Sequence, residues 1–273
     1  MALEISSAWG AAVRGVGVTF REFFSQTALA YTPSWEPVVK TITDNGATAT
    51  FSGTTGAGTL TIFSEGSTVP KKNRYKLYDT GFSHRQYGGQ VEVSRMQLMN
   101  REFNDKFDEF KHLSVSANVT RSKAPAQIFN GAFTNSGTFE LNGIRVVTYA
   151  DGRNVASTAH PRVDGGAAQS NASSVGLTLS DNNFETGRVA LFEQLQDDGT
   201  PITITGDIYL VVPMALEKNA KIITGSDLRS ATANNDINIY SGGGYKVLST
   251  VWLGAAAGGS DTAWFIVAPS VAK

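Results

Sequence analysis

The side chains best able to do chemistry in this sequence are its three histidines, His84, His112 and His160. None of them belongs to an H-E-x-x-H motif, and no carboxylate cluster stands at the spacing of metal ligands. Ser157 precedes His160 by three residues, so the two could act as nucleophile and base. A serine hydrolase would also need a G-x-S-x-G turn between a strand and a helix, which is missing. We therefore predict no catalytic residue, no metal site and no cofactor.

Two short segments share part of a ligand-binding pattern. Asp197-Asp198-Gly199 could begin a calcium loop, but the periodic oxygen ligands and terminal Glu of an EF-hand are absent from the sequence. Ser241-Gly242-Gly243-Gly244 lacks the lysine and the spacing of a phosphate-binding loop. The first segment is predicted to be a turn and the second a hairpin connection.

Aromatic and basic residues interleave in one further stretch, which could bind single-stranded nucleic acid by stacking and charge. The residues are Lys71, Lys72, Arg74, Tyr75, Lys76, Tyr78, Phe82, Arg85 and Tyr87. An exposed hairpin that contacts neighbouring subunits explains the same residues and is the favoured interpretation. The formal net charge of −1 also argues against a dedicated nucleic-acid binder.

The composition is that of a globular protein with one large or two modest domains. Of its 273 residues, 41% are hydrophobic and 17% are charged, which allows a sizeable core. The 28 glycines favour strands, turns and long loops over a helical bundle. The absence of cysteine excludes disulfides and fits synthesis in a reducing cytoplasm. The N-terminus lacks the pattern of a signal peptide, and no apolar run is long enough to span a membrane.

Residues 35–93 have the pattern of β-structure. Thr48–Phe51 and Thr59–Phe63 alternate between polar and apolar side chains, and further strands are expected near Arg74–Leu77 and Gln90–Val93. The alternating apolar face is thin, so this hairpin region should lie against something outside itself.

The strongest helical pattern begins after Ser94, which forms a capping box with Gln97. Apolar residues then recur every three or four positions to about residue 119, and Pro125 is expected to break the pattern. The residues expected to face the core are Met99, Phe103, Phe107, Phe110 and Leu113. Near the N-terminus, a shorter pattern puts Phe20, Phe23 and Phe24 on one helical face. That face could cover the chain's own core or a neighbouring subunit.

The second half of the chain alternates between helical and strand patterns. Ser180 is predicted to cap a helix, and Ile208–Val212 to form a strand that enters a helix with Pro213 at its first position. The first of these helices should bury Phe184, Leu191, Phe192 and Leu195. Further strands are predicted at Ile237–Tyr240, Tyr245–Trp252 and Ala263–Val267.

Several motifs occur here in a recognisable order. They are Tyr149-Ala150-Asp151-Gly152, Ser157-Thr158-Ala159-His160-Pro161, Gln169-Ser170-Asn171, Asp197-Asp198-Gly199-Thr200-Pro201-Ile202 and Val211-Val212-Pro213-Met214-Ala215-Leu216-Glu217. The series resembles the major capsid proteins of tailed bacteriophages with the Hong Kong 97-like fold, in the branch of the Mu head subunit. Glu65-Gly66 followed by Pro70, and then Ser94-Arg95, also resemble the family's extended loop and the segment after it. The likeness runs roughly from Trp35 to Val267.

The resemblance implies an α+β fold with four parts: an N-terminal arm (1–34), an extended-loop β-hairpin region (35–93), a peripheral domain with a long spine helix (94–160 and 245–273), and an axial domain (161–244). Contacts between subunits would come from the arm phenylalanines and from the extended loop. The loop residues are Glu65, Gly66, Val69, Pro70, Lys71, Lys72 and Arg74.

The implied function is that of a structural head protein, made in the host cytoplasm, that assembles into the icosahedral virion shell around double-stranded DNA. Its partners would be copies of itself in hexamers and pentamers, scaffolding and portal proteins, and packaged DNA bound without sequence specificity. A decoration protein is also expected, or a second chain that supplies strands beyond Val267. No membrane is involved.

Some relatives join their subunits through an isopeptide bond from an extended-loop lysine that can stand just before the proline. Val69 occupies that position here, and Lys71 and Lys72 follow Pro70, so a cross-link is disfavoured. Two other functions remain open. A nanocompartment shell of the same fold would look similar, whereas a phage tail or receptor-binding β-protein would lack the long helix and a two-helix domain at 180–224.

Overall fold

The computed structural model describes residues 34–46, 48–55, 59–72, 74–99, 104–148, 151–196, 199–228 and 236–270. Its chain forms two compact units: Arg85–Lys123 belongs to unit 1, and Trp35–His84 with Ala124–Lys273 to unit 2. The mixture of helices and small sheets confirms the predicted α+β class. The arm phenylalanines lie outside the described residues, and the four-part division of the chain stays a prediction.

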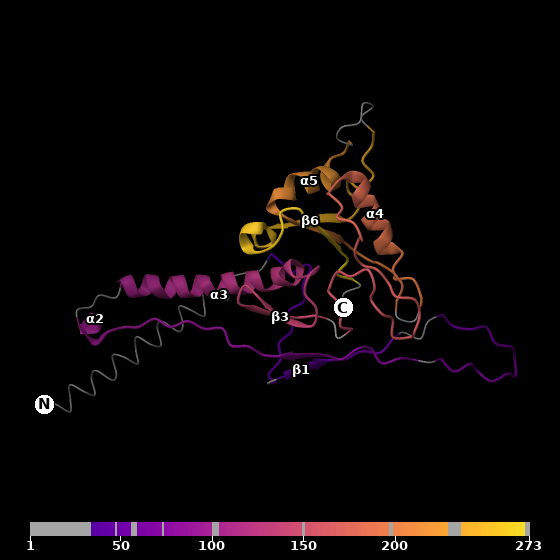
Figure 1. Ribbon diagram of the computed structural model, residues 1–273, viewed down its shortest axis with the longest axis horizontal. Helices are drawn as coiled ribbons and strands as arrows, with labels where there is room; N and C mark the ends of the chain where they lie inside the picture. The colour runs from indigo at the N-terminus through magenta and orange to yellow at the C-terminus, as the bar shows by residue number, and fades with distance from the viewer. Residues whose placement is uncertain are drawn as a thin grey trace. The chain divides into compact units, whose positions relative to one another are not determined.

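Unit 1 is built from helices, drawn in magenta in Figure 1. Helix α2 covers Arg95–Met99, and helix α3 covers Asn104–Asn130 and continues into unit 2. The predicted capping box is confirmed: Gln97 N–H donates to Ser94 Oγ at 3.2 Å, and Ser94 N–H donates to Gln97 Oε1 at 3.0 Å. These two bonds satisfy backbone donors that a helix N-terminus leaves unpaired.

Helix α3 does not end where the sequence predicted, because it continues through Pro125. A proline inside a helix removes a backbone hydrogen bond, at a cost of about 3 kcal/mol. Tertiary contacts of the last turn offset this cost: Ala126 and Gln127 are fully buried. Asn130 Nδ2 also donates to the carbonyl of Trp252 at 3.0 Å. The helix end is thus fixed by residues distant in sequence.

The main sheet of unit 2 has three strands in the order β6-β5-β7. The central strand β5 (Ile208–Pro213) pairs in parallel with β6 (Tyr245–Thr250) and antiparallel with β7 (Phe265–Val267). Its near-continuous apolar sequence is that of a strand buried on both faces. Two further antiparallel pairs join β1 (Thr48–Phe51) to β2 (Thr80–Ser83) and β3 (Thr138–Leu141) to β4 (Ile144–Val147).

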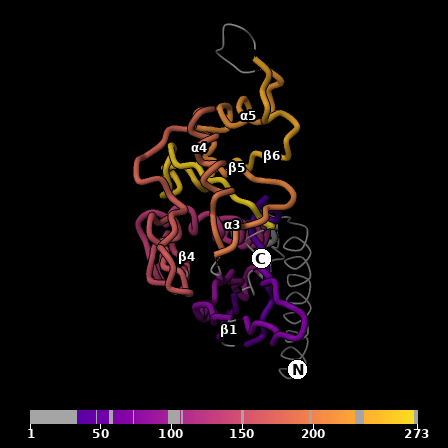
Figure 2. Tube along the Cα trace, turned by 90° about the vertical axis from the view of Figure 1, so that its right-hand side faces the viewer, coloured from indigo at the N-terminus to yellow at the C-terminus, as the bar shows by residue number. Residues whose placement is uncertain are grey.

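The core of unit 2 lies on both faces of this sheet. On one face, Leu210 and Val212 pack with Phe184 of α4 (Asp181–Phe192) and Ala220 of α5 (Glu217–Gly225). Figures 1 and 2 show these two helices together on that side. On the other face, Val211 packs with Trp35, Ala126 and Leu253. This division follows from the alternation of side chains along a strand.

Short helical turns complete the described fold. The 3₁₀ helix η1 (Met214–Leu216) links β5 to α5, and η2 (Val251–Leu253) and η3 (Ala255–Ala257) follow β6. Pro213 is the last residue of β5 and the N-cap of η1, whose first residue is Met214. The prediction that Pro213 is itself the first helical residue was therefore wrong by one position. Ser180 caps α4 as predicted, but α4 ends at Phe192, which leaves Leu195 beyond it.

Four predicted strands are not formed. Thr59–Phe63 and Gln90–Val93 have irregular backbone. Arg74–Leu77 contains only the isolated bridge of Lys76 with Thr54, and Ile237–Tyr240 contains only an isolated bridge and a turn. Alternating side chains favour a strand only when a partner offers a ladder of backbone groups. In the described part of the chain, β1 has β2 as its partner. The segments that failed to form strands have no continuous ladder with any partner among the described residues.

A partly exposed ionic contact links α4 to the turn before β6. Arg188 donates to both carboxylate oxygens of Glu185 at 2.7 Å, and Tyr240 Oη donates to Glu185 Oε2 at 2.8 Å. These hydrogen bonds, chiefly those from Arg188, hold the pKa of Glu185 at about 2. The carboxylate therefore stabilises the fold at pH values above its unfolded pKa, and this contribution is lost as the pH falls from about 4.5 to 2.

We expect Glu185→Gln to lower the free energy of unfolding at pH 7 by about 1 kcal/mol, because solvent screens a partly exposed pair. The difference from wild type should shrink steadily below pH 4.5. Urea denaturation at pH 7 and pH 3 measures it, with Asp79→Asn, in the exposed pair with Lys76, as the control. An equal difference at both pH values would show that charge is not the cause.

Candidate functional site

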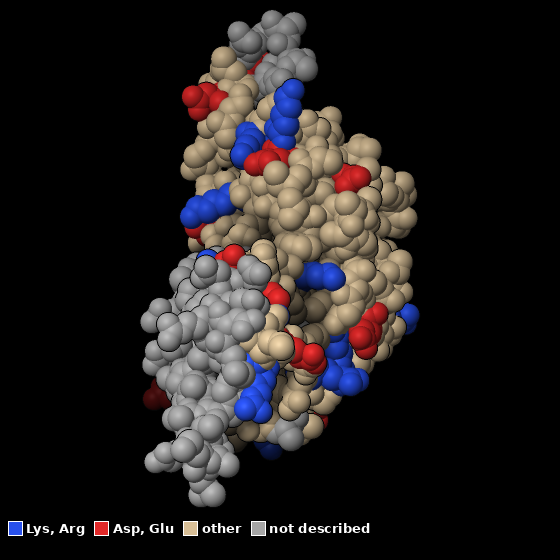
Figure 3. All heavy atoms as spheres, turned by 90° about the vertical axis from the view of Figure 1, so that its left-hand side faces the viewer, with Lys and Arg blue, Asp and Glu red and all other residues tan. Residues whose placement is uncertain are grey.

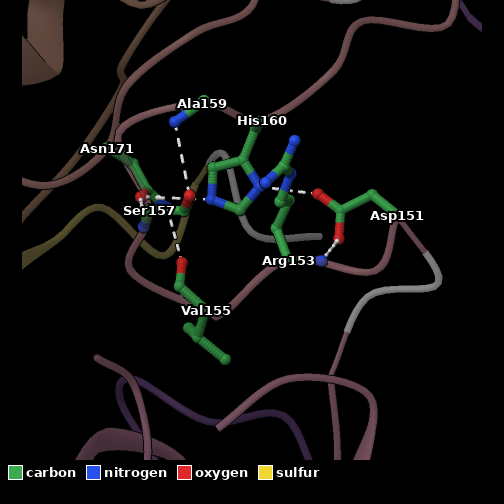
Figure 4. Close-up of polar contacts among 7 residues, drawn as sticks. All are labelled: Asp151, Arg153, Val155, Ser157, Ala159, His160 and Asn171. Carbon is green, nitrogen blue, oxygen red and sulfur yellow. Dashed lines mark hydrogen bonds and ion pairs between the residues drawn. The ribbon is translucent and has the colours of Figure 1, made fainter. Parts of the chain in front are cut away.

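The histidine with the most contacts, His160, lies in the loop region between β4 and α4 (Figure 4). Its Nδ1 lies 2.6 Å from Asp151 Oδ2, and Arg153 N–H donates to the other oxygen of that carboxylate at 2.9 Å. The aspartate is nearly buried and the imidazole is half-buried. This half of the arrangement has the form of the His-Asp pair in a hydrolase triad.

The other side of His160 faces an amide and not a nucleophile. Its Nε2 lies 3.2 Å from Asn171 Oδ1, which also accepts from Ser157 N–H at 2.8 Å. Asn171 Nδ2 donates to the carbonyl of Val155 at 2.7 Å, so backbone groups fix the orientation of this amide. The Ser157 hydroxyl instead accepts from Ala159 N–H at 3.3 Å. The cluster therefore ties together loop segments and does not activate the serine.

The other two histidines do not join this cluster. His84 lies 3.4 Å from Asp44 in an exposed pair, and His112 is exposed on α3. Among the residues that the structure describes, no three His, Cys, Asp or Glu side chains gather at metal-binding distances. In the same part of the chain, no helix is long and apolar enough to cross a membrane.

The predicted contact loop is part of unit 2 and begins at a short ladder of backbone hydrogen bonds (Figure 1, indigo). Thr55 N–H donates to Tyr75 O, and Leu77 N–H donates to Gly53 O, both at 2.9 Å. Farther out, the Lys72 ammonium donates to the Thr59 carbonyl at 2.5 Å and joins the two arms of the loop. Regular strand pairing is absent between residues 59 and 72.

The tip of the loop is a turn at Glu65-Gly66, held by Ser67 N–H donating to Ser64 O at 3.1 Å. Gly66 has a φ of +78°, a conformation that glycine adopts without strain. All of the predicted loop contact residues are exposed: Glu65, Gly66, Val69, Pro70, Lys71, Lys72 and Arg74. Their role in contacts between subunits stays a prediction.

The loop also exposes large apolar side chains that the single chain leaves uncovered. Leu60 is 88% exposed and Ile62 is 98% exposed, and Phe63 and Val69 are also exposed. Contiguous exposed apolar side chains are typical of interaction surfaces. The sequence predicted that Leu60 and Ile62 lie in a strand, and their role as exposed surface residues was not predicted. The alternation of apolar and polar side chains was the one available signal that they share a face.

The predicted core residues of the long helix can be only partly located. Phe110 and Leu113 are half-buried on α3. Phe103 lies outside the described residues, as do the side chains of Met99 and Phe107. The fully buried side chain on this part of α3 is a polar one, Ser114. The role of the five residues as a core therefore stays a prediction.

The charges of unit 2 do not form a basic field on the face drawn in Figure 3. Lys and Arg side chains alternate there with Asp and Glu among the described residues. Elsewhere on the surface of unit 2, ion pairs join Lys246 to Asp207 and Lys221 to Glu217, both at 2.5 Å. Interspersed and paired charges leave little net attraction for a polyanion.

Comparison with known proteins adds three structural relatives. The capsid chain of bacteriophage JBD30 superposes with a TM-score of 0.60 at 15% identity, over 83% of this chain and 93% of that chain. The JBD30 procapsid chain gives 0.58 at 16% identity, over 89% and 99%. The JBD30 capsid decorated with minor capsid protein trimers gives 0.59 at 16% identity, over 82% and 92%. At such low identity these matches establish the fold alone.

The two features that a tail or receptor-binding protein would lack are both present. Helix α3 has 27 residues, and α4 and α5 form the two-helix region expected between residues 180 and 224. No curated protein matches the chain. A family model described as phage capsid protein matches residues 77–273, which is most of the sequence. The chain therefore belongs to the phage capsid protein family, and it is a structural subunit of a phage head shell.

Proposed function

We propose that this chain is the major head subunit of a tailed phage and builds an icosahedral shell around double-stranded DNA in the virion. The observation that carries the proposal is the family match over residues 77–273. The similarity to both a capsid and a procapsid chain supports a subunit that takes part in assembly. The role is structural and not enzymatic, in keeping with a histidine cluster that holds a loop.

The Hong Kong 97-like details belong to the same proposal. The exposed loop at residues 59–72 extends over a neighbouring subunit, α3 serves as the spine helix, and the arm at residues 1–34 adds a further contact. The exposure of Leu60 and Ile62 supports the first of these roles, because burial of such side chains stabilises a contact by about 1.5–3 kcal/mol each. Subunits would group into hexamers and pentamers, with scaffolding and portal proteins as assembly partners in the host cytoplasm.

A second polypeptide on the shell is also part of the proposal. One structural relative is a capsid decorated with minor capsid protein trimers. In this chain β7 is an edge strand of the main sheet, and edges with unpaired backbone groups are usually covered. A decoration protein or a strand from another chain would satisfy that edge.

The contents of the shell should be held without specific recognition. With a net charge of −1 and alternating surface charges, the isolated subunit should bind duplex DNA weakly and equally across sequences. Fluorescence anisotropy with two unrelated duplexes, at low and at physiological salt, tests this. Tight binding that prefers one sequence and survives physiological salt would contradict a container role.

A further inference from the structure

A second apolar surface of unit 2 is carried by residues that follow α5 and precede β6 (Figures 1 and 2). Leu228 and Ile237 form an isolated antiparallel bridge there, and Ile239 follows two residues later. Ile237 is 77% exposed and Ile239 is 71% exposed, and Leu228 is also exposed. We call these three residues the apolar knob.

The backbone that carries the knob is fixed by a buried asparagine. Asn238 Nδ2 donates to the carbonyls of Ile223 at 2.8 Å and Ser226 at 2.7 Å, and Asn238 Oδ1 accepts from Tyr240 N–H at 3.0 Å. Asn238 and Tyr240 are buried, whereas Ile237 and Ile239 are exposed, so the segment directs its two isoleucines to the surface. The backbone between the two isoleucines is therefore already ordered in the subunit, which lowers the entropy cost of binding through them.

The same unit carries an open groove of about 910 Å³ along α5 and β6. Its apolar lining includes Met214, Ile222 and Val247. Its charged lining consists of Lys218 and of Lys221 paired with Glu217. Met214 is 47% exposed, so the apolar lining is accessible. The groove does not hold the knob of its own chain, since the knob side chains remain exposed.

The charges beside the two surfaces are opposite. The exposed residue Asp236 directly precedes the knob. In the groove Lys221 is paired with Glu217, and Lys218 adds a further positive charge. Complementary charges favour one partner and one orientation over others. Because the chain is a shell subunit, many copies of it meet at high local concentration, and each copy presents both surfaces.

We propose that the apolar knob of one subunit docks in the α5–β6 groove of the adjacent copy. A contact between two different surfaces is head-to-tail, and such contacts close into rings when the rotation between copies permits. This inference rests on the proposed function, in which subunits group into hexamers and pentamers, and it names the surfaces that join them.

The chain has no cysteine, so cross-linking can test the contact directly. Chains carrying Ile237→Cys are produced together with chains carrying Met214→Cys, assembled, and mildly oxidised. Since a disulfide requires the two Cα atoms to lie about 4.4–6.8 Å apart, the pair should give at least about tenfold more heterodimer than a distant pair. The matched control is Ile237→Cys with Val175→Cys, because Val175 is 67% exposed elsewhere on unit 2.

A second variant tests the contact without depending on disulfide geometry. Ile237→Asp with Ile239→Asp should leave the unfolding midpoint of the subunit unchanged, because both side chains are exposed, and should abolish assembly. Val175→Asp should assemble like wild type. Normal assembly of the double variant would overturn the inference, as would equal cross-linking of both cysteine pairs within shells. If wild-type subunits form no shell at all, the proposed function fails instead.

Discussion

Deletion of Ser64–Asn73 is expected to abolish shell assembly and to leave the subunit folded. The loop around the Glu65-Gly66 turn contributes nothing to either hydrophobic cluster of unit 2. Its backbone is joined to the rest of the chain by the short ladder at Thr55 and Leu77. Loss of the tip therefore removes contacts with neighbours without opening a core. Circular dichroism measures the fold, and sedimentation velocity measures the particles.

A matched pair of point variants separates loss of the loop from loss of its apolar contacts. Leu60→Ser with Ile62→Ser should weaken assembly, because burial of these two side chains against a neighbour would stabilise each contact by about 3–6 kcal/mol. Val175→Ser, on an exposed valine of the same unit, should have no such effect. If the deletion lowers the yields of soluble subunit and of shells equally, the loop is part of the subunit's own fold.

Truncation of Phe184 should have the largest effect on the stability of the subunit. The ring is fully buried at the start of α4 and packs edge-on against Tyr240 and Tyr245, with centroid distances of 5.1 and 5.5 Å. Phe184→Ala should lower the free energy of unfolding by about 3–5 kcal/mol, because it removes apolar burial and leaves a cavity. That is a large part of a typical domain's stability of about 5–15 kcal/mol.

The same helix supplies the control for this prediction. Phe192 ends α4, is 41% exposed and lies 5.7 Å from the Arg188 guanidinium. Phe192→Ala should cost no more than about 1 kcal/mol, the value of an exposed cation–π contact. Urea denaturation followed by circular dichroism compares the two. Similar losses for both variants would mean that Phe184 is not at the centre of the core.

Local sequence signals predicted those elements whose cause is local. Ser94 and Ser180 each cap a helix through a bond to the third residue along, as their positions indicated. The apolar run at Ile208–Val212 gave a strand buried on both faces. A cap depends on residues three apart, and a continuous apolar run is itself a local signal of a buried strand, so a single sequence is enough to predict both.

The incorrect predictions depend on contacts that are distant in sequence. Pro125 does not end α3, because the turn after it is buried. Thr59–Phe63 has the alternation of a strand, but nothing in the described part of the chain pairs with it. Ile237 and Ile239 were expected in a strand, but the segment ends in a turn. Asn238 is buried there, and the two isoleucine side chains are exposed to solvent. Periodicity cannot distinguish a side chain that faces the core from one that faces another molecule.

The proposed contact surfaces were predictable only in part for the same reason. The resemblance at Glu65-Gly66 and Pro70 located the exposed loop. Composition and spacing alone predicted a hairpin but not what it would lie against. The α5–β6 groove brings Met214 and Val247 together from separate segments, and no local motif marks it. A surface made by tertiary packing has no signal in one sequence until the fold is known.

Electron microscopy of the purified full-length chain under assembly conditions tests the central claim most directly. A head-shell subunit should form closed particles of uniform diameter whose subunits are arranged in hexamers and pentamers. The family match and the capsid-like fold both predict this result. A uniform population of monomers under every assembly condition, with the scaffolding partner also supplied, would contradict the account.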